Sequence, residues 1–531
     1  MDLLISLTAV HLKAIVQGMQ KARDLPVYPI LLSAYSALAL LAANRSEVEF
    51  GVVMRPLLLL LASSMLLVVL LWLLLKNPGK AGLLAGIWIT LFITYGHVYH
   101  LLEGSAAWLA ALGRHRFLLP VYLVIAAAST ILLLRKQSRF STLTRVLNIA
   151  GLVLLVFPSF QLVSFSFTTS QAEKEASQWT FAQPELQPDY PDNLPDVYFI
   201  VLDTYTSSKA LASDFGFDNS AFVSNLQAMG FYVAECSQTN YTYTQGALTA
   251  ALNLEYLPEL KERLQTVALD DNIWVLMKES QVRHQLQNLG YKTVAFETSY
   301  DWSRIKDADI YLGEAQSSIT WQQLNAFEQM WLKSTALLLF NDLDVKTRVV
   351  DDAAIQSHPY GDHIEKQLFV LQTLPSIAAD RDPTFTFSHI LIPHVPYVFG
   401  ADGTILTDPA YYSGDMAGPV NEEYLQKGYT GEIAFLNNRL ETILAEILDQ
   451  SETPPIIVLM GDHGVRDANR AKIFFAVYLP DGAEKVLYPS ITPVNIFRII
   501  FDEYFGTSYG LLPDITYTDD GQVIPVPETC E

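Results

Sequence analysis

The sequence contains little cysteine and little basic charge. Its 531 residues include only two cysteines, Cys236 and Cys530, so the chain forms at most one internal disulfide. The 34 Lys and Arg residues are outnumbered by 56 Asp and Glu residues, which gives a net charge of −22. Because nucleic acid binds a basic face, this charge argues against a nucleic-acid partner. Whether the two cysteines pair depends on their proximity and on an oxidising compartment, and the sequence leaves that open.

Charge is distributed unevenly along the chain. Up to residue 171 there are 13 basic and 5 acidic residues, a net of +8, so the remainder holds 21 basic and 51 acidic residues, a net of −30. Two physically different modules are therefore joined. We expect a transmembrane module over 1–169, a polar linker dotted with prolines over 170–195, and an outer domain over 196–531.

The first module contains about five apolar segments long enough to cross a bilayer. They cover approximately 26–43, 54–75, 81–100, 117–134 and 147–166. Nine basic residues flank these segments on the side of the N-terminus and four on the other side, which predicts a cytoplasmic N-terminus and an outer domain beyond the cell (inner or plasma) membrane. The N-terminal segment lacks a signal-peptide cleavage pattern, and we expect it to lie on the membrane surface as an amphipathic helix.

The outer domain alternates between strand and helix patterns. This alternation predicts an α/β domain with a mostly parallel central sheet, in which ligands bind at the carboxyl ends of the strands. Predicted strands cover 197–202, 231–234, 293–296, 384–391, 456–460 and 473–479, and predicted helices cover 218–229, 279–289 and 421–450.

Candidate metal ligands follow two of these strands. The strand over 456–460 leads into Gly461-Asp462-His463-Gly464, and the strand over 197–202 ends at Asp203. A carboxylate oxygen together with an imidazole nitrogen suits zinc or manganese better than calcium. A helix N-cap is the alternative role for Asp203, and a simple turn is the alternative for the Asp-His pair.

A hydroxyl at the start of a helix is the candidate nucleophile. The segment Asn240-Tyr241-Thr242-Tyr243-Thr244 leads into a stretch of small residues that is typical of a helix. A helix N-terminus stabilises a phosphate or sulfate oxyanion, and a hydroxyl beside a metal can act as the nucleophile. Thr242 and Thr244 both fit; Thr244 is preferred because it lies nearer the helix start, and an ordinary N-cap is the alternative for either.

Together these residues resemble the alkaline phosphatase superfamily, and most closely its membrane-anchored sulfatase-like branch of lipoteichoic acid synthases and phosphoethanolamine transferases. The likeness includes the five spans, Asp203, the Asn-Tyr-x-x-Thr helix start, the segment Ile392-Pro393-His394-Val395-Pro396 and the Asp-His turn. The resemblance implies that Asp203, Thr244, Asp462 and His463 share one divalent metal (Zn, Mn or Mg). It also implies that His394 faces the donor's phosphoryl group or a second metal, as a general acid or oxyanion partner.

The sequence departs from this family in two places. The formylglycine motif Cys-x-Pro-Ser-Arg of sulfatases is absent, and no histidine occurs between Gly464 and Pro480, where transferases of the family often have one. A second metal site is therefore in doubt, and Arg466 or Asn469 is the candidate to line the pocket instead, with Asn240 as a further substrate-binding residue. His358 and His363 are interpreted as exposed loop histidines and not as ligands.

The resemblance predicts a metal-dependent transferase or hydrolase. It would move a phosphoglycerol or phosphoethanolamine group from a membrane phospholipid to an envelope glycan or lipid, through a phospho-threonine intermediate. Two alternatives remain: a phosphatase or sulfuric ester hydrolase acting on soluble esters, and a non-catalytic membrane-anchored binding protein of the same fold. The sequence names neither the head group, the acceptor, the metal nor the oligomeric state.

Overall fold

The computed structural model divides the chain into two compact units. The first combines residues 1–166 with 324–348, and the second combines 167–323 with 349–531. The predicted N-terminal surface helix lies outside the described residues, as does most of the predicted linker. The structure describes residues 25–103, 112–136, 140–177, 194–264, 272–313, 325–341, 358, 360–379, 382–408, 410–412, 421–518, 521–527 and 530.

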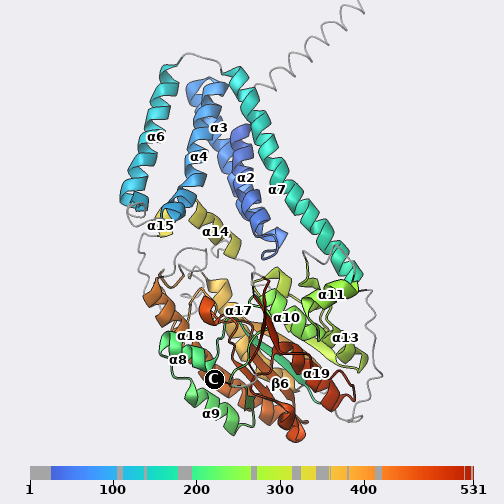
Figure 1. Cartoon of the computed structure of the whole chain (residues 1–531). Helices are drawn as coiled ribbons and strands as arrows, with labels where there is room; N and C mark the ends of the chain where they lie inside the picture. Colours follow the sequence, from blue (N-terminus) through green and yellow to red (C-terminus); the bar gives the residue numbers. More distant parts are fainter. Residues whose placement is uncertain are drawn as a thin grey trace, which may run out of the picture. The chain divides into compact units, whose positions relative to one another are not determined.

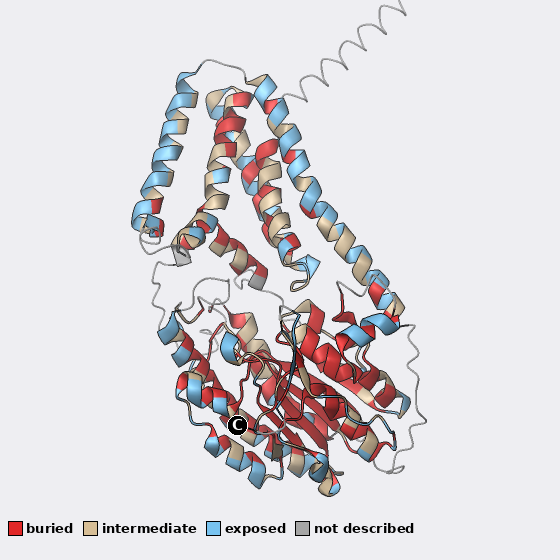
Figure 2. Ribbon diagram, viewed as in Figure 1, coloured by how far each residue is buried: buried red, intermediate tan, exposed pale blue. Residues whose placement is uncertain are grey.

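The first unit is built around apolar helices, at the positions where the sequence predicts five spans. Among the described residues four helices are long and apolar enough to cross a membrane, while the fifth apolar helix, α2, has 16 residues. The chain is thus a multi-pass membrane protein. Figure 2 shows that the described parts of α3, α6 and α7 are largely exposed, as helix faces that meet lipid are. The helices are α2 (Tyr28–Ala43), α3 (Met54–Leu75), α4 (Pro78–Glu103), α6 (His115–Arg135) and α7 (Ser141–Ala176).

The last turns of α7 belong to the second unit. Ala172 and Ala176 are 0% and 1% exposed, and the Thr169 hydroxyl donates to Asn272 Oδ1 at 3.0 Å. The helix continues to Ala176 because residues 170–176 contain neither proline nor glycine. Residues 170–176, assigned to the linker by their polar composition, are therefore helical.

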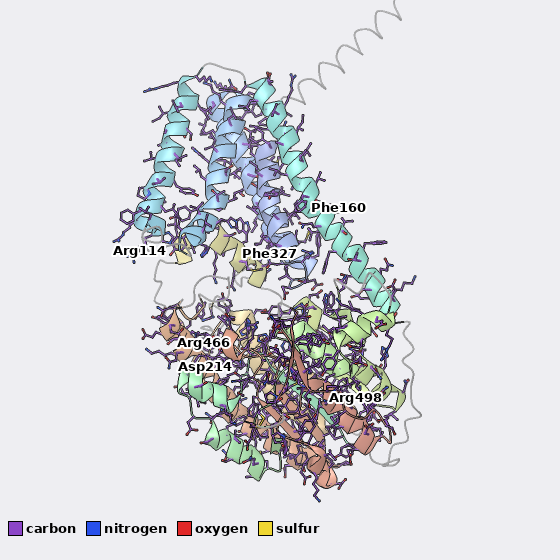
Figure 3. The ribbon with its side chains drawn as sticks, in the orientation of Figure 1. Arg114, Phe160, Asp214, Phe327, Arg466 and Arg498 are labelled. Atoms are coloured by element: carbon purple, nitrogen blue, oxygen red, sulfur yellow. A yellow bond between two sulfur atoms is a disulfide. The ribbon has the colours of Figure 1, made fainter. Side chains whose placement is uncertain are left out.

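A short segment from far along the chain belongs to the first unit. It contains α14 (Ala326–Ser334) and α15 (Leu338–Asn341), although the strands and helices on both sides of it in the sequence belong to the second unit. Phe327, labelled in Figure 3, lies on α14 and is 0% exposed.

The second unit confirms the predicted α/β class. Its seven-stranded sheet has the order β2-β7-β6-β1-β5-β3-β4, in which only β7 runs antiparallel to its neighbours. Strands β1, β5 and β6 are buried along their whole length. This burial explains the continuous apolar sequences of β1 and β6, whereas β5 has Thr, Ser and His among its apolar residues. The strands are β1 (Val197–Leu202), β2 (Tyr232–Val233), β3 (Lys292–Phe296), β4 (Ile310–Leu312), β5 (Thr384–Ile390), β6 (Ile456–Gly461) and β7 (Phe475–Tyr478), beside a separate hairpin of β8 (Ile515–Tyr517) and β9 (Val523–Pro525).

Helices cover both faces of this sheet (Figure 1). Helices α10, α12, α13 and α19 pack together on one face, and α9, α17 and α18 pack together on the other. The longest, α18, buries the apolar stripe of its 29 residues in the main core. The helices of this unit are α8 (Ser208–Phe215), α9 (Ser220–Ala228), α10 (Thr244–Asn253), α11 (Leu257–Leu264), α12 (Val275–Lys278), α13 (Gln281–Asn288), α17 (Gly361–Thr373), α18 (Glu422–Gln450) and α19 (Pro493–Tyr504).

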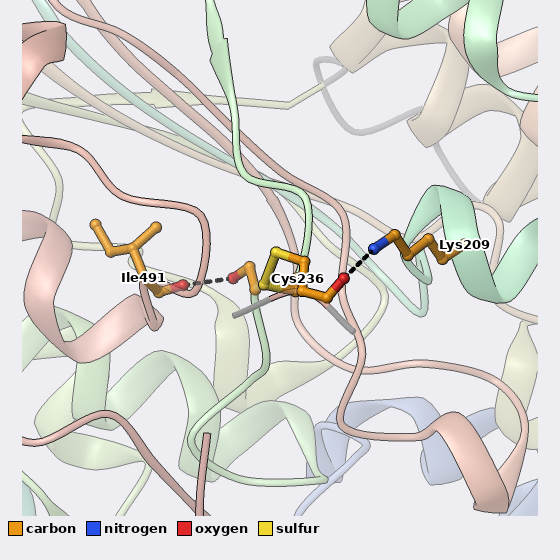
Figure 4. Close-up of a disulfide and its surroundings, with 5 residues drawn as sticks. Lys209, Cys236 and Ile491 are labelled. Atoms are coloured by element: carbon orange, nitrogen blue, oxygen red, sulfur yellow. Dashed lines mark hydrogen bonds between the residues drawn. A yellow bond between two sulfur atoms is a disulfide. The ribbon is translucent and has the colours of Figure 1, made fainter. Parts of the chain in front are cut away.

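The two cysteines, whose pairing the sequence leaves open, form a disulfide. Cys236 and Cys530 have Cα atoms 5.3 Å apart across a sequence separation of 294 residues. The carbonyl of Cys530 also accepts a hydrogen bond from Lys209 Nζ at 3.0 Å, and the neighbouring Ser237 hydroxyl donates to the Ile491 carbonyl at 2.7 Å (Figure 4). The C-terminal segment is thus held against the start of the loop that leads to α10.

Candidate metal centre

Two acidic side chains meet because of the strand order. In the sheet β1 lies between β5 and β6, and Leu202 at its end pairs with Gly461 on β6 and with Ile390 on β5. The next residues on the two strands, Asp203 and Asp462, therefore emerge side by side at the carboxyl edge. This is the edge at which parallel sheets bind ligands.

Asp203, Asp462 and His463 form the one His/Cys/Asp/Glu group of metal-site dimensions in the described part of the chain. One ligand atom from each lies within 4.8 Å of the others, and the residues are 3%, 0% and 5% exposed. Asp203 Oδ1 and Asp462 Oδ2 are buried and accept no hydrogen bond from any described residue. A buried carboxylate oxygen without a partner is costly in free energy, and a cation beside both oxygens removes that cost.

Backbone hydrogen bonds fix the orientation of the Asp-His pair. Asp462 Oδ1 accepts from the backbone amides of Thr204 and His463, both at 2.8 Å, which leaves Oδ2 directed elsewhere. The Nδ1 atom of His463 lies 3.0 Å from the Gly464 carbonyl, so Nδ1 donates a hydrogen bond to that oxygen. Nε2 is therefore the ring nitrogen that can ligate a metal.

The turn after β1 has an unusual backbone conformation. Thr204 has φ of +63°, in the left-handed region that a residue with a branched side chain rarely adopts. The Tyr429 hydroxyl on α18 donates to the Thr204 carbonyl at 2.8 Å and accepts from the Thr206 amide at 3.1 Å. Tyr429 therefore holds the turn in the shape that directs the Thr204 amide to Asp462.

Glycine is required where β6 meets this turn. A Cβ atom on Gly461 would lie 2.0 Å from the Tyr205 carbonyl oxygen, closer than any real contact of this kind. The first glycine of the Asp-His motif thus allows the ends of β1 and β6 to approach each other.

Imidazoles surround the Asp203 carboxyl. His389, on β5, places Nε2 at 3.5 Å from Asp203 Oδ2 and is buried against the Trp302 ring. Burial raises the pKa of Asp203, whereas the charge of His394 and the nearby His389 lowers it. The second influence is stronger, and the pKa lies well below its usual range, so this carboxyl is ionised and can ligate a cation.

The interpretation of His358 and His363 as exposed loop residues is wrong for both. His358 is 9% exposed, and its Nε2 lies 2.8 Å from the Leu406 carbonyl, which makes it a structural residue. His363 lies in the first turn of α17, with Nε2 buried and no described hydrogen-bond partner. Burial lowers its pKa to about 4, and His394 and Asp203 both influence this pKa. His363 is therefore a neutral imidazole.

The predicted nucleophile begins a helix. Thr244 is the first residue of α10, and the preceding Tyr243 makes no side-chain cap, so its side chain leaves the amides of the first turn uncapped. Thr242 is 7% exposed, and its carbonyl accepts from Arg470 Nε at 2.7 Å. Arg470 thereby joins the threonine loop, residues 240–244, to the segment that follows the Asp-His pair.

Asn240 and Arg466, the predicted substrate-binding residues, have protein partners. Asn240 is fully buried; its amide donates to the Ile515 carbonyl, and its Oδ1 accepts from the Val494 amide. Arg466, labelled in Figure 3, forms a bidentate pair with Glu422 and lies over the Phe215 ring at 5.1 Å. In this conformation Asn240 joins the threonine loop to β8 and α19. The guanidinium of Arg466 is paired with Glu422.

The donor set fits a divalent cation. Two ionisable carboxylates with unpartnered oxygens and one imidazole with a free Nε2 match the hard and borderline ligands of zinc and manganese. With a hydroxyl as fourth ligand, such a set would suit a tetrahedral zinc ion.

Comparisons with known proteins gave matches among solved structures alone. No family model matches the chain, and no curated protein matches it. The zinc-bound C-terminal periplasmic domain of EcEptC from Escherichia coli is 12% identical, with a TM-score of 0.39, over 65% of this chain and 97% of that domain.

Two other solved structures are similar over much of their length. The integral membrane lipooligosaccharide phosphoethanolamine transferase EptA from Neisseria meningitidis is 11% identical, with a TM-score of 0.34, over 87% of this chain and 88% of that one. A phosphonate monoester hydrolase from Agrobacterium radiobacter is 14% identical, with a TM-score of 0.34, over 61% and 75%.

Proposed function

We propose that the chain is a metal-dependent phosphotransferase that takes a phospho-substituent from a membrane phospholipid and passes it to an envelope acceptor. The observation that carries this proposal is the buried group of Asp203, Asp462 and His463, in which two carboxylate oxygens lack a described partner. A lipid donor is supported by the membrane unit, because an enzyme of soluble esters needs no more than one anchor.

The residues divide the chemistry between them. Asp203, Asp462 and His463 would hold the cation together with Thr244. Bound there, a divalent cation supplies positive charge that lowers the pKa of a nearby hydroxyl and balances the charge of a phosphoryl group. The α10 N-terminus offers backbone amides to the oxygens of the same phosphoryl group.

The reaction would proceed in two displacements. Thr244 Oγ1 loses its proton and forms a bond to phosphorus, while the bond from phosphorus to the diacylglycerol oxygen breaks and that oxygen takes up a proton. An acceptor hydroxyl then attacks the phospho-threonine, loses its proton and releases the Thr244 hydroxyl. His394 would carry one of these protons.

The second unit would lie outside the cytoplasm. The excess of basic residues on the N-terminal side of the membrane segments supports this orientation. The Cys236–Cys530 disulfide supports it as well, because disulfides persist in oxidising compartments.

Substitution of the two threonines tests the proposal. Purified full-length protein in lipid nanodiscs is incubated with phosphatidylethanolamine or phosphatidylglycerol, and diacylglycerol release and phospho-threonine are measured by mass spectrometry. Thr244→Ala should lower diacylglycerol release on the order of 10³-fold or more, whereas the matched Thr242→Ala should retain most of it.

The outcomes separate the possibilities. Loss of turnover in Thr242→Ala alone would make Thr242 the nucleophile. Wild-type protein should contain a bound divalent metal that Asp462→Asn loses, and a wild-type preparation without bound metal that stays inactive when zinc or manganese is added would overturn the proposal. Turnover of soluble phosphate or sulfate esters without any lipid turnover would favour the hydrolase alternative.

A further inference from the structure

The segment 325–341 makes contacts that place it inside the membrane unit. Phe327 and Trp331, on α14, are 0% and 8% exposed and share one apolar cluster with α2 and α3. Trp331 also lies 6.0 Å from the Phe92 ring on α4. The residues of this cluster from α2, α3 and the turn before α3 are Ala37, Leu41, Val53 and Leu60.

The backbone of this segment is joined directly to a membrane helix. The Ala336 amide donates to the Phe92 carbonyl at 2.8 Å, and a Cβ atom on Gly96 would lie 2.2 Å from the Lys333 carbonyl oxygen. Gly96 therefore permits the close approach, as small residues do between membrane helices. The hydrogen bond satisfies an amide outside regular helix geometry, which is necessary wherever backbone enters a bilayer.

The depth of this contact follows from helix length. Phe92 lies 11 residues from the end of α4 at Glu103, about 16 Å along the helix. The whole of α4 has 26 residues, about 39 Å, whereas the hydrocarbon core of a bilayer is about 30 Å thick. An element bonded to Phe92 therefore reaches the hydrocarbon region.

One ion pair fixes the start of α14. Glu328 forms a bidentate pair with Arg55 near the start of α3, with side chains 6% and 20% exposed. Glu328 also completes a capping box with Asn325, whose side chain accepts from the Glu328 amide at 2.8 Å. Removal of the Arg55 charge leaves the buried Glu328 carboxylate without this ion pair, which is strongly unfavourable in a membrane environment.

The segment leaves the second unit at the edge that holds the metal centre. Strand β4 is parallel to β3 and β5, so its end at Leu312 lies at the same carboxyl edge as Asp203 and Asp462. Twelve residues separate Leu312 from Asn325, a reach of at most about 45 Å. The chain re-enters the second unit at α17, whose first turn carries His363.

We propose that 325–341 is a membrane-embedded anchor, held in the membrane unit by Arg55 and Glu328, on which turnover of a donor resident in the bilayer depends. This inference rests on the proposed function. Because the chain on both sides of the anchor belongs to the second unit, the anchor is a second covalent connection of that unit to the membrane unit, beside α7. Access to lipid then depends on the anchor, whereas the chemistry at the metal centre does not.

Charge reversal tests the anchor in the full-length protein in nanodiscs. Two substrates are compared: a phospholipid in the nanodisc, and a water-soluble p-nitrophenyl phosphodiester with the same head group. Glu328→Lys should lower turnover of the lipid at least tenfold and leave turnover of the soluble ester within twofold of wild type. The double reversal Arg55→Glu with Glu328→Arg should return lipid turnover to within about threefold, because the Asn325 side chain still caps the helix.

A matched control changes charge elsewhere. Asp382 pairs with Lys292 on the surface at the opposite edge of the sheet, with side chains 57% and 43% exposed. Asp382→Lys introduces the same change of charge and should leave both activities unchanged. A parallel loss of both activities in Glu328→Lys would overturn the proposal.

Hydrogen–deuterium exchange gives a readout that needs no activity. Residues 325–341 should be protected in the wild type, should exchange faster in Glu328→Lys, and should regain protection in the double reversal. If the wild type turns over neither substrate, the proposed function fails, and exchange alone then decides on the anchor. Equal deuterium exchange of residues 325–341 in wild type and Glu328→Lys would overturn the proposed anchor.

Discussion

Glu432 is a fully buried carboxylic acid whose role is to position a loop. Its Oε1 accepts from the Val398 amide at 2.7 Å and the Phe399 amide at 3.2 Å, just beyond the segment that carries His394. One helical turn away on α18, Tyr429 holds the turn beside Asp203. Tyr429 and Glu432 thus hold the two loops of the site, one beside Asp203 and the other next to His394.

Replacement of Glu432 by glutamine should make stability less dependent on pH. Burial raises the pKa of Glu432 well above its usual range, despite the two backbone hydrogen bonds. Its stabilising contribution is therefore complete below the unfolded pKa of about 4.3 and is lost as the pH rises through the folded pKa. Glu432→Gln keeps an acceptor oxygen and should raise Tm by a few degrees relative to wild type at pH 8, with a smaller difference at pH 5.

Glu423→Gln, an exposed substitution at the start of the same helix, is the control for this measurement in detergent. A Tm difference between wild type and Glu432→Gln that is the same at both pH values would contradict the expectation.

Sequence position predicts some site residues and misses others for a physical reason. Asp203 and the Asp462-His463 pair could be found because each directly follows an apolar strand, and parallel strands end at one edge. His389 lies inside β5, beside Ser388 and two threonines, and does not follow the end of an apolar strand, so it gives no such signal. His363 lies in a polar segment whose burial depends on packing from distant parts of the chain, which local composition does not reveal.

At the scale of elements, the junction of β6 with the turn after β1 tolerates no side chain. Gly461→Ala should lower the free energy of unfolding by about 1–3 kcal/mol or more, because the Tyr205 backbone must move away from the added Cβ. The same shift displaces Thr204 and with it one hydrogen bond to Asp462, so bound metal should decrease as well. Thermal unfolding and elemental analysis measure the two effects.

Gly431→Ala, in the middle of α18, is the matched substitution for comparison. A Cβ there meets its nearest atoms at 3.6 Å, an ordinary contact, so alanine should be neutral or stabilising. Similar Tm values for the two variants would refute the steric role of Gly461.

Many of the main elements could be predicted from the sequence, whereas α14 and α15, like β4 and several helices of the second unit, could not. Apolar runs and alternating patterns are local, so they predict the membrane helices and most strands of the parallel sheet. Helices α14 and α15 are short, and nothing in their sequence distinguishes them from surface helices of the second unit. Their partners, such as Arg55 and Phe92, lie more than 200 residues away in the sequence.

At the scale of the molecule, the disulfide closes a loop that contains most of the second unit. Cys236→Ser should lower the free energy of unfolding by about 2–5 kcal/mol, because the cross-link restricts the unfolded chain. A reductant should lower the Tm of the wild type to that of the variant and leave the variant unchanged. A wild-type Tm that does not respond to reductant under conditions that free both thiols would contradict this expectation.

The pair of Arg55 and Glu328 also has a consequence for the order of biosynthesis. The two residues are separated by 273 positions, and a ribosome adds about 5–20 residues per second. About 14–55 s therefore pass between the synthesis of Arg55 and the synthesis of Glu328. During that interval the unit lacks the Glu328 carboxylate and the apolar surfaces of Phe327 and Trp331. The membrane part of this protein finishes folding only after much of the second unit has been made, so a chain that stops before residue 325 leaves an incomplete bundle for quality control to recognise.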